Sequence, residues 1–181
     1  MTSTSLLACV LVLVVAAATD IKTRNIPNIV TVGGLALGLA IHVAIGVVDD
    51  GLFGGLRGLA FAIVGVVACS VVPFIAWRRG EMGGGDVKLF AAMGSLAGPV
   101  IGFDVQAITF LISLLVLFPW NLVRHGALHV ALANVRVGMT NVLRRREARA
   151  AYVAGPKLPP VILAPTIGLA FLISVLRHGV L

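Results

Sequence analysis

Charge is scarce in this sequence, and the scarcity indicates the solvent in which the chain folds. Only 12% of the 181 residues are charged, 59% are hydrophobic, and the mean hydropathy is +1.08. Soluble domains carry roughly 25% charged residues. The composition therefore excludes an ordinary soluble domain and predicts an integral membrane protein.

Cysteine is also scarce. The chain has two cysteines, Cys9 and Cys69, and each lies inside an apolar run. Two isolated cysteines make neither a CxxC metal motif nor a disulfide framework. We expect both to be small apolar packing residues.

Several familiar catalytic motifs are missing as well. The sequence has no HExxH and no GxSxG motif, and we expect none of its four histidines to be a metal ligand. We therefore expect no metal site and no cofactor. We expect His42, which lies within an apolar run, to be packed or hydrogen-bonded rather than a ligand.

Long apolar runs, by contrast, are abundant. A transmembrane helix needs about 20 mostly apolar residues. Six runs approach that length: residues 1–19, 25–48, 58–77, 87–103, 105–123 and 158–176. We predict an all-α fold, a polytopic membrane helix bundle of about six transmembrane helices that forms a single domain over residues 1–181. Residues 1–5 lack Lys and Arg, so the first run is expected to be a retained helix rather than a signal peptide.

The basic residues predict the orientation of the bundle. With the N-terminus outside, twelve of the fourteen Lys and Arg residues fall on the cytoplasmic face, as the positive-inside rule requires. Arg57, Arg177, Asp49, Asp50 and Asp104 then fall on the outer face. A basic cytoplasmic face meets anionic lipid of the bilayer, so the net charge of +7 requires no nucleic-acid partner.

The longest polar connection, residues 124–157, mixes apolar residues with seven basic ones. We expect it to be a cytoplasmic loop, part of which forms an amphipathic helix on the membrane surface. A role in holding substrate is the alternative interpretation.

Glycines recur at helix-packing spacing. Three pairs have the GxxxG pattern: Gly34 and Gly38, Gly54 and Gly58, and Gly94 and Gly98. Small residues at this spacing let helix backbones approach closely in lipid. We expect a compact bundle.

Two acidic residues lie at the predicted cytoplasmic membrane boundary. Asp20 ends the first apolar run and Asp86 opens the fourth, 66 positions later. When two carboxyl groups approach closely they cannot both ionise, so the pair shares one proton. The ionised member can then take a proton from an attacking water, while the protonated member polarises a peptide carbonyl and later protonates the leaving amine.

Three glycines, Gly83, Gly84 and Gly85, precede Asp86. Glycine permits backbone conformations closed to other residues and lets another chain approach, so these residues are candidates for the floor of a peptide-binding loop. An ordinary turn followed by a helix cap is the alternative. Lys88 is expected either to reach the membrane interface or to tune the pair of carboxylates.

These motifs resemble a known family. "GGGD" fits the GxGD signature of membrane aspartyl proteases, and "DIKTRNIPN" and "GGGDVKLFAAMG" look like the two motifs of type IV prepilin peptidases. The resemblance implies that Asp20 and Asp86 are catalytic. It also implies that the protein cuts the leader peptide from prepilin-like substrates, just before their hydrophobic stretch, at the cytoplasmic face of the inner membrane.

The sequence departs from the larger members of that family. They carry an additional N-terminal cytoplasmic region with paired cysteines and methylate the new N-terminus, and this chain has neither that region nor those cysteines. We therefore expect peptidase activity without methyltransferase activity. The short form is similar to the peptidases of Flp/Tad pilus systems and to archaeal preflagellin peptidases. The segment "LPPVILAPTIGLA" matches the family only loosely, and the sequence assigns it no function.

Two other classes of function fit the same residues. In a small channel or transporter, the two aspartates would bind cations or relay protons. In a non-catalytic pilus assembly subunit, the same residues would have lost their activity.

Overall fold

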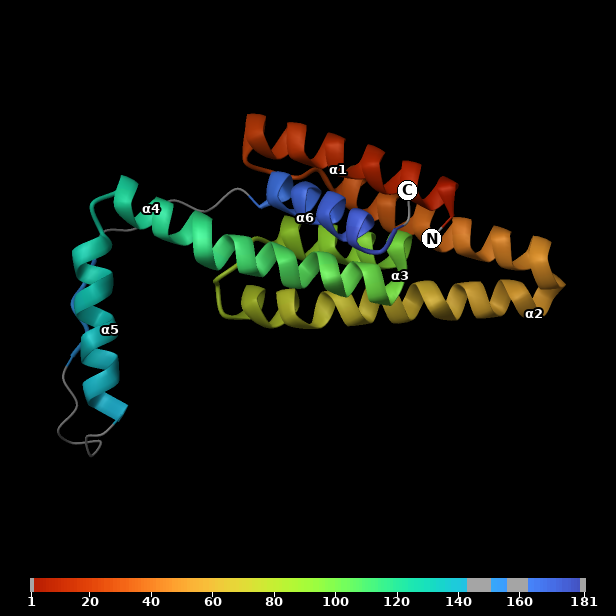
Figure 1. Ribbon diagram of the computed structural model, residues 1–181. Coiled ribbons are helices and arrows are strands. Elements are labelled where there is room, and N and C mark those ends of the chain that lie inside the picture. Colours follow the sequence, from red (N-terminus) through yellow and green to blue (C-terminus); the bar gives the residue numbers. More distant parts are fainter. Residues whose placement is uncertain (1, 143–150, 156–162, 180–181) are drawn as a thin grey trace. The chain divides into compact units, whose positions relative to one another are not determined.

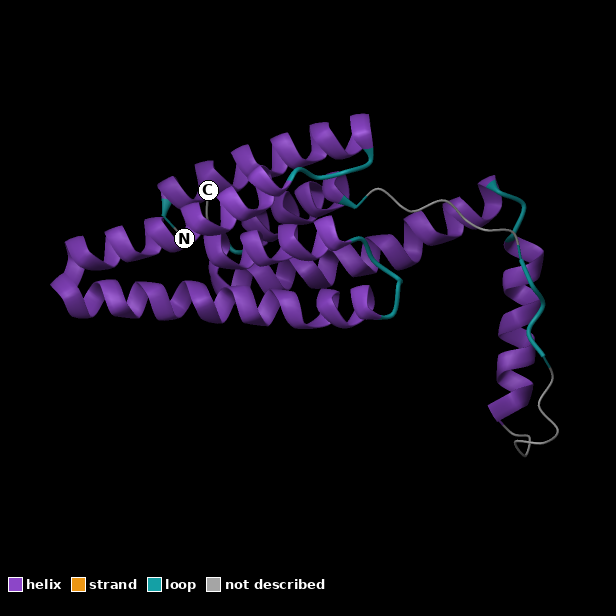
Figure 2. Cartoon of the chain, turned by 180° about the vertical axis from the view of Figure 1, so that it is seen from behind, coloured by secondary structure: helices purple, strands orange, loops and turns teal. Residues whose placement is uncertain are grey.

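The computed structural model describes residues 2–142, 151–155 and 163–179, and this part of the chain is helical with no strand (Figure 2). The elements are α1 (Ser3–Thr23), α2 (Asn28–Arg78), α3 (Gly84–Ile112), the π-helix η1 (Ser113–Leu117), α4 (Phe118–Arg124), α5 (Leu128–Val142) and α6 (Ala164–Arg177). The prediction of an all-α fold is confirmed. The chain forms two compact units, with α1, α2, α3 and α6 in unit 1 and η1, α4 and α5 in unit 2.

Helix α1 has clear start and stop signals. The Thr2 side chain accepts a hydrogen bond from the Ser5 amide at 3.3 Å, which satisfies one of the free amides of the first turn. At the other end Arg24 adopts a left-handed conformation, with φ of 52°, and its amide bonds to the Asp20 carbonyl at 2.8 Å. Pro27 then caps the start of α2. Asp20 therefore lies in the last turn of α1, just before a tight connection.

Helix α2 is interrupted in its middle. Gly51 has φ of 59° and ψ of −146°, a conformation that only glycine adopts readily. The helix folds back on itself at this point (Figure 1), and the backbones of Gly46 and Gly54 touch across the two arms. The runs expected at residues 25–48 and 58–77 correspond to these two arms.

Helix α3 is also interrupted. Gly98 has φ of 79° and is followed by Pro99, which supplies no amide for the helix. A side-chain carbon placed on Gly102 would lie 3.2 Å from the Gly94 Cα, although eight residues of straight helix would separate them by about 12 Å. The chain therefore folds back here, earlier than the boundary expected at Asp104. Asp104 stays inside the helix because its carboxylate is paired with Arg177 at 2.8 Å.

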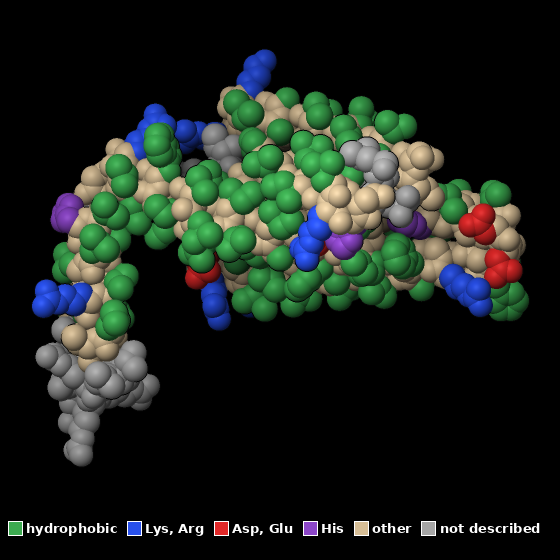
Figure 3. Space-filling view, in the orientation of Figure 1, with side chains coloured by type: hydrophobic (Ala, Val, Ile, Leu, Met, Phe, Trp, Pro, Cys, Tyr) green, Lys and Arg blue, Asp and Glu red, His purple; other side chains and the backbone are tan. Residues whose placement is uncertain are grey.

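The helices of unit 1 carry an apolar exterior. Hydrophobic side chains cover most of the face seen in Figure 3, and large ones such as Leu7, Phe53 and Val100 are exposed. Among the residues that the structure describes, three helices are long and apolar enough to cross a membrane: α1, α2 and the helical stretch Gly84–Arg124. Such a surface suits lipid rather than water. The count of six crossings and the outward N-terminus stay predictions.

Charged residues on the predicted outer face form ion pairs. Arg57 lies 3.3 Å from Asp50, and Arg177 lies 2.8 Å from Asp104. These are the two basic residues that the positive-inside rule leaves outside. Each has an acidic partner that was assigned to the same face.

The interior of unit 1 lies between α1, α3 and α6. Its fully buried side chains include Phe90, Met93, Ile167 and Phe171. The close glycine packing that we expected is confirmed where Gly38 meets the backbone of α3 and where Gly94 meets that of Gly65.

The other expectations for residues inside the apolar runs are also confirmed. Cys9 and Cys69 are both fully buried and free, as packing residues. The Nε2 atom of His42 lies 3.2 Å from the Leu96 carbonyl oxygen, and its ring packs against Phe61.

Unit 2 contains the helix that was expected within residues 124–157. The Asn134 side chain of α5 pairs with both backbone groups of Val153, at 2.9 and 2.7 Å. Its placement on a membrane surface stays a prediction. Residues 143–150 and 156–157 of that segment lie outside the described residues.

Candidate active site

Asp20 is buried, with 8% of its surface exposed, at the end of α1. Its Oδ2 atom accepts a hydrogen bond of 3.2 Å from the backbone amide of Ala164, the first residue of α6. The first amides of a helix have no partner within it, and the helix dipole makes that end positive. This contact fixes the direction of one carboxylate oxygen of Asp20.

The sequence explains why α6 begins at this point. Pro165 has a fixed φ suited to the first turn and needs no hydrogen-bond partner for its nitrogen. The buried face of α6, which includes Ile167 and Phe171, then packs against α1. Because the end of α1 meets the start of α6, the two helices run antiparallel.

The contact with Ala164 was missed from the sequence. The proline in "LAPT" marks a helix start, so the free amides could have been anticipated. Their partner could not, because Asp20 lies 144 positions away and nothing local links the two segments.

Asp86 is half-buried in the first turn of α3. Its carboxylate accepts a hydrogen bond from the backbone amide of Gly83. An acidic side chain that reaches back three residues to the helix start is half of a capping box. Asp86 is thus inside the first turn of α3 rather than at its N-cap, and the bond to Gly83 leaves the second carboxylate oxygen for other partners.

The structure brings the two aspartates together. Asp20 and Asp86 lie close enough for their carboxylates to interact electrostatically. Asp20 comes from the end of α1 and Asp86 from the start of α3, so the pair exists only in the folded chain. Two like charges at short range favour a state in which the pair holds one proton.

The three glycines before Asp86 act through their small size rather than through their conformation. None of Gly83, Gly84 and Gly85 has a positive φ, and their role as the floor of a peptide site stays a prediction. A side-chain carbon on Gly83 would lie 3.0 Å from the Asp86 Oδ2 atom, whereas one on Gly84 would meet Trp77 at an ordinary 3.4 Å. Gly83 thus leaves room for the carboxylate.

Two contacts join the segments that carry the aspartates. Gly85 lies against Ile26, so that a side-chain carbon there would be 3.4 Å from the Ile26 Cβ. The Lys88 Nζ atom donates a hydrogen bond of 2.7 Å to Asn28 Oδ1. Ile26 is 5% exposed, and its buried position was not anticipated. Lys88 thus ties the start of α3 to the start of α2.

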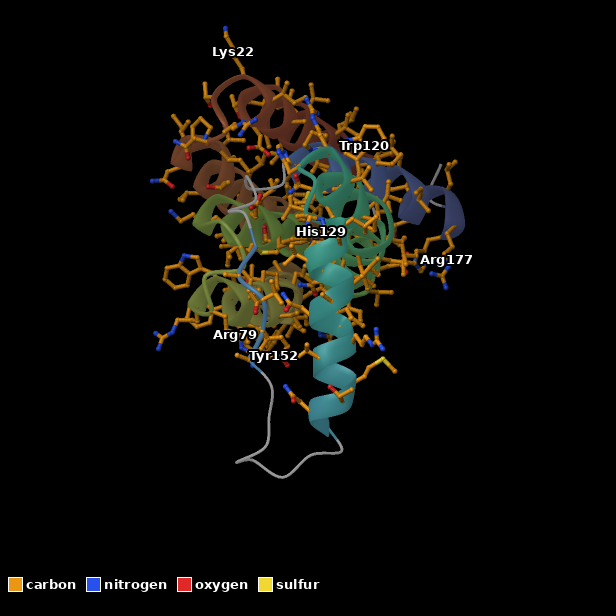
Figure 4. All side chains as sticks on the ribbon, turned by 90° about the vertical axis from the view of Figure 1, so that its left-hand side faces the viewer. Lys22, Arg79, Trp120, His129, Tyr152 and Arg177 are labelled. Carbon is orange, nitrogen blue, oxygen red and sulfur yellow. The ribbon has the colours of Figure 1, made fainter. Side chains whose placement is uncertain are left out.

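Basic residues lie near each aspartate in the sequence. Lys22 lies two residues after Asp20 and Arg79 lies just after α2, and both side chains are exposed. Figure 4 shows them projecting outward from the helices of unit 1. Within residues 2–142, 151–155 and 163–179, no group of three His, Cys, Asp or Glu residues could hold a metal ion.

Comparison with protein families gives one match. The model of the type IV leader peptidase family matches residues 7–120, a range that contains Asp20, Asp86 and both motifs. No match to a curated protein or to a solved structure was found. The family match covers more than half of the chain and agrees with the motifs at the paired carboxylates. This chain belongs to the type IV leader peptidase family, whose members are proteases.

Proposed function

We propose that this protein is an aspartic endopeptidase of the inner (cytoplasmic) membrane in which Asp20 and Asp86 are the catalytic residues. It removes the leader peptide from prepilin-like substrates at the cytoplasmic face, as in a Flp/Tad pilus system. The observation that carries the proposal is the interaction of the two carboxylates at the meeting point of the two motifs. The family match supports the protease class.

The hydrogen bonds suggest a role for each carboxylate. We assign Asp20 the role of the member that accepts a proton, since its Oδ2 atom is held by the Ala164 amide at the positive end of α6. Asp86 then holds the proton that the pair shares. In this arrangement Asp20 is the general base and Asp86 the general acid.

The reaction then proceeds without a covalent intermediate or a metal ion. Asp20 removes a proton from water as the water oxygen attacks the carbonyl carbon, and Asp86 donates a hydrogen bond to the carbonyl oxygen. When the carbon–nitrogen bond breaks, the leaving amine takes the Asp86 proton. The proton from water stays on Asp20, so the pair again holds one proton.

The membrane topology that we propose has six crossings with the N-terminus outside, within a single membrane domain. The breaks at Gly51 and Gly98, which divide α2 and α3 into arms, support this count. The crossings are α1, two arms of α2, two arms of α3 with its continuation, and α6. Asp20 and Asp86 then lie at the cytoplasmic boundary, where a substrate anchored by a hydrophobic segment presents the bond that precedes it.

A cleavage assay tests this function. Co-expression with a candidate prepilin is expected to give a shortened product with the wild type and none with Asp20→Asn or Asp86→Asn. Asp49→Asn, a change at an exposed residue of the predicted outer face, is the matched control and should cleave normally. Each variant is checked for accumulation in membranes. Full cleavage by either variant of the pair would refute the assignment, and loss of wild-type activity with EDTA would refute a metal-free mechanism.

A further inference from the structure

An apolar groove lies between α1 and α6 on the outer surface of unit 1. Its volume is about 370 Å³, which admits a few side chains but not a whole helix. Its lining residues are all apolar or small: Val10, Leu13, Val14 and Ala17 from α1, and Pro165, Gly168, Leu169, Phe171 and Leu172 from α6. Several of them are well exposed, so the groove is open to the membrane.

One end of the groove lies at the candidate active site. Ala17 is one helical turn before Asp20, and Pro165 directly follows Ala164, whose amide is bonded to Asp20. Three residues of helix span about 4.5 Å along its axis. The groove therefore runs along α1 and α6 and stops within one turn of a carboxylate.

The middle of the groove is unusually open. A side-chain carbon on Gly168 would meet no other atom within 4 Å. Gly168 and Ala17 are small residues on the two walls, and small residues let another helix approach closely in a membrane. A helix face could thus enter the groove without any rearrangement of α1 or α6.

We propose that this groove docks the hydrophobic segment of the substrate as a helix; the proposal rests on the leader peptidase function stated above. The apolar lining suits a membrane-embedded helix. A lipid chain would meet the same lining, but only a segment that carries a scissile bond at its polar end makes use of a groove that ends at Asp20. Docking places the residues that precede the helix beside the two carboxylates, which explains how one bond is selected.

Filling the groove tests the proposal. The Gly168→Leu variant places a side chain into open space, so the fold should be unaffected while the substrate helix is excluded. We expect KM to rise about tenfold, a loss of about 1.4 kcal/mol in binding, with kcat unchanged. Gly33→Leu is the matched control, because Gly33 is also helical and also has no atom within 4 Å of an added carbon. It should match the wild type.

Cross-linking gives a second, independent test. Leu172 in the groove and Val32 on α2 are exposed to nearly the same extent, 54% and 55%. One cysteine is introduced at either position in an Asp86→Asn background, which leaves the substrate uncleaved. Each variant is mixed with a substrate that has a cysteine in its hydrophobic segment, and the mixture is oxidised. Leu172→Cys should form the mixed disulfide and Val32→Cys should not. Cys9 and Cys69 are buried and are not expected to react.

The outcomes of these two tests distinguish failure of the groove proposal from failure of the proposed peptidase function. If the wild type cleaves and Gly168→Leu has an unchanged KM, the groove assignment is wrong while the peptidase assignment stands. Cross-links only between two copies of Leu172→Cys would show that a second copy of the protein covers the groove. The absence of any cross-link would indicate that lipid fills the groove. Either result overturns the docking proposal. Failure of the wild type to cleave overturns the proposed function itself.

Discussion

Gly83 has the tightest fit of the three glycines that lead into Asp86. An added Cβ would lie 3.0 Å from the Asp86 Oδ2 atom, so Gly83→Ala should displace the carboxylate and lower kcat at least about tenfold. Gly84→Ala is the control, because its Cβ makes an ordinary contact with Trp77 and alanine favours the helix start. Initial rates of prepilin cleavage distinguish the two. Equal cleavage rates of the two variants would show that catalysis does not depend on the small size of Gly83.

The backbone N–H of Ala164 is a hydrogen-bond donor that a single substitution can remove. Ala164→Pro deletes the N–H that bonds Asp20 at 3.2 Å; proline also disfavours the α-region conformation of Leu163, so the variant is first checked for accumulation in membranes. A hydrogen bond to a charged group is worth about 1.5–3 kcal/mol, so kcat/KM should fall roughly 10- to 100-fold. Ala164→Ser keeps the amide and should remain active. Equal activity of the two variants would contradict the role of α6 in holding Asp20.

Sequence reasoning singled out the two carboxylates, and their catalytic role stays a prediction. Asp20 and Asp86 were singled out because they lie at matching ends of apolar runs, and the structure brings them within electrostatic range. Their supporting contacts were missed, since Ala164 acts through its backbone and Ile26 through burial. A sequence motif predicts neither a backbone hydrogen bond of this kind nor the burial of a particular side chain.

At the scale of the element, α6 is held at both ends. Asp20 bonds its first amide, and Arg177 near its last turn pairs with Asp104 at 2.8 Å. The Asp104 side chain is only 16% exposed, whereas both partners of the Arg57–Asp50 pair are largely exposed. The two ion pairs should therefore differ in strength, because water screens exposed pairs.

This difference predicts a contrast in thermal stability. Arg177→Met leaves a partly buried carboxylate without its closest partner and should lower the Tm by a few degrees, at roughly 2–4 °C per kcal/mol for a chain of this size. Arg57→Met should lower the Tm less than Arg177→Met does, since exposed pairs contribute about 0–1 kcal/mol. Thermal unfolding in detergent measures both. A larger effect at Arg57 would contradict the account.

The helices themselves and the break in α2 were largely predictable, but the position of the break in α3 was not. Apolar length alone predicts the helices because each backbone polar group in lipid must find its partner within the chain. The end of the fourth run was placed at Asp104 by its charge, whereas the chain turns at Gly98 and Pro99. The charge of Asp104 is compatible with its place inside α3 because Arg177 pairs with it. Sequence reasoning could not foresee this contact, since the two residues are 73 positions apart.

At the scale of the whole molecule, the sidedness of the membrane protein follows from its charges. Arg79 belongs to the predicted cytoplasmic face and Arg57 to the outer face. Single Arg79→Cys and Arg57→Cys variants are to be labelled with a membrane-impermeant thiol reagent in intact cells and in inverted vesicles. We expect Arg57→Cys to react only in cells and Arg79→Cys only in inverted vesicles. Labelling of both from one side would refute the proposed topology.

The site depends on the fold as a whole, because α1, α3 and α6 each supply part of it. Asp20 and Asp86 come from separate segments and Ala164 from a third, and all three meet only when unit 1 is packed. This is why the catalytic chemistry could be proposed from two motifs while the position and support of each group required the structure.

Asp20 and Asp86 are proposed to act together as one catalytic pair. Its most direct test is the kcat of purified protein in liposomes for Asp20→Asn, Asp86→Asn and the double variant, each with a matched prepilin. Groups that act together are not additive, so all three variants should show the same background rate. A double variant that is far slower than either single one, or a single variant with substantial activity, would contradict the dyad.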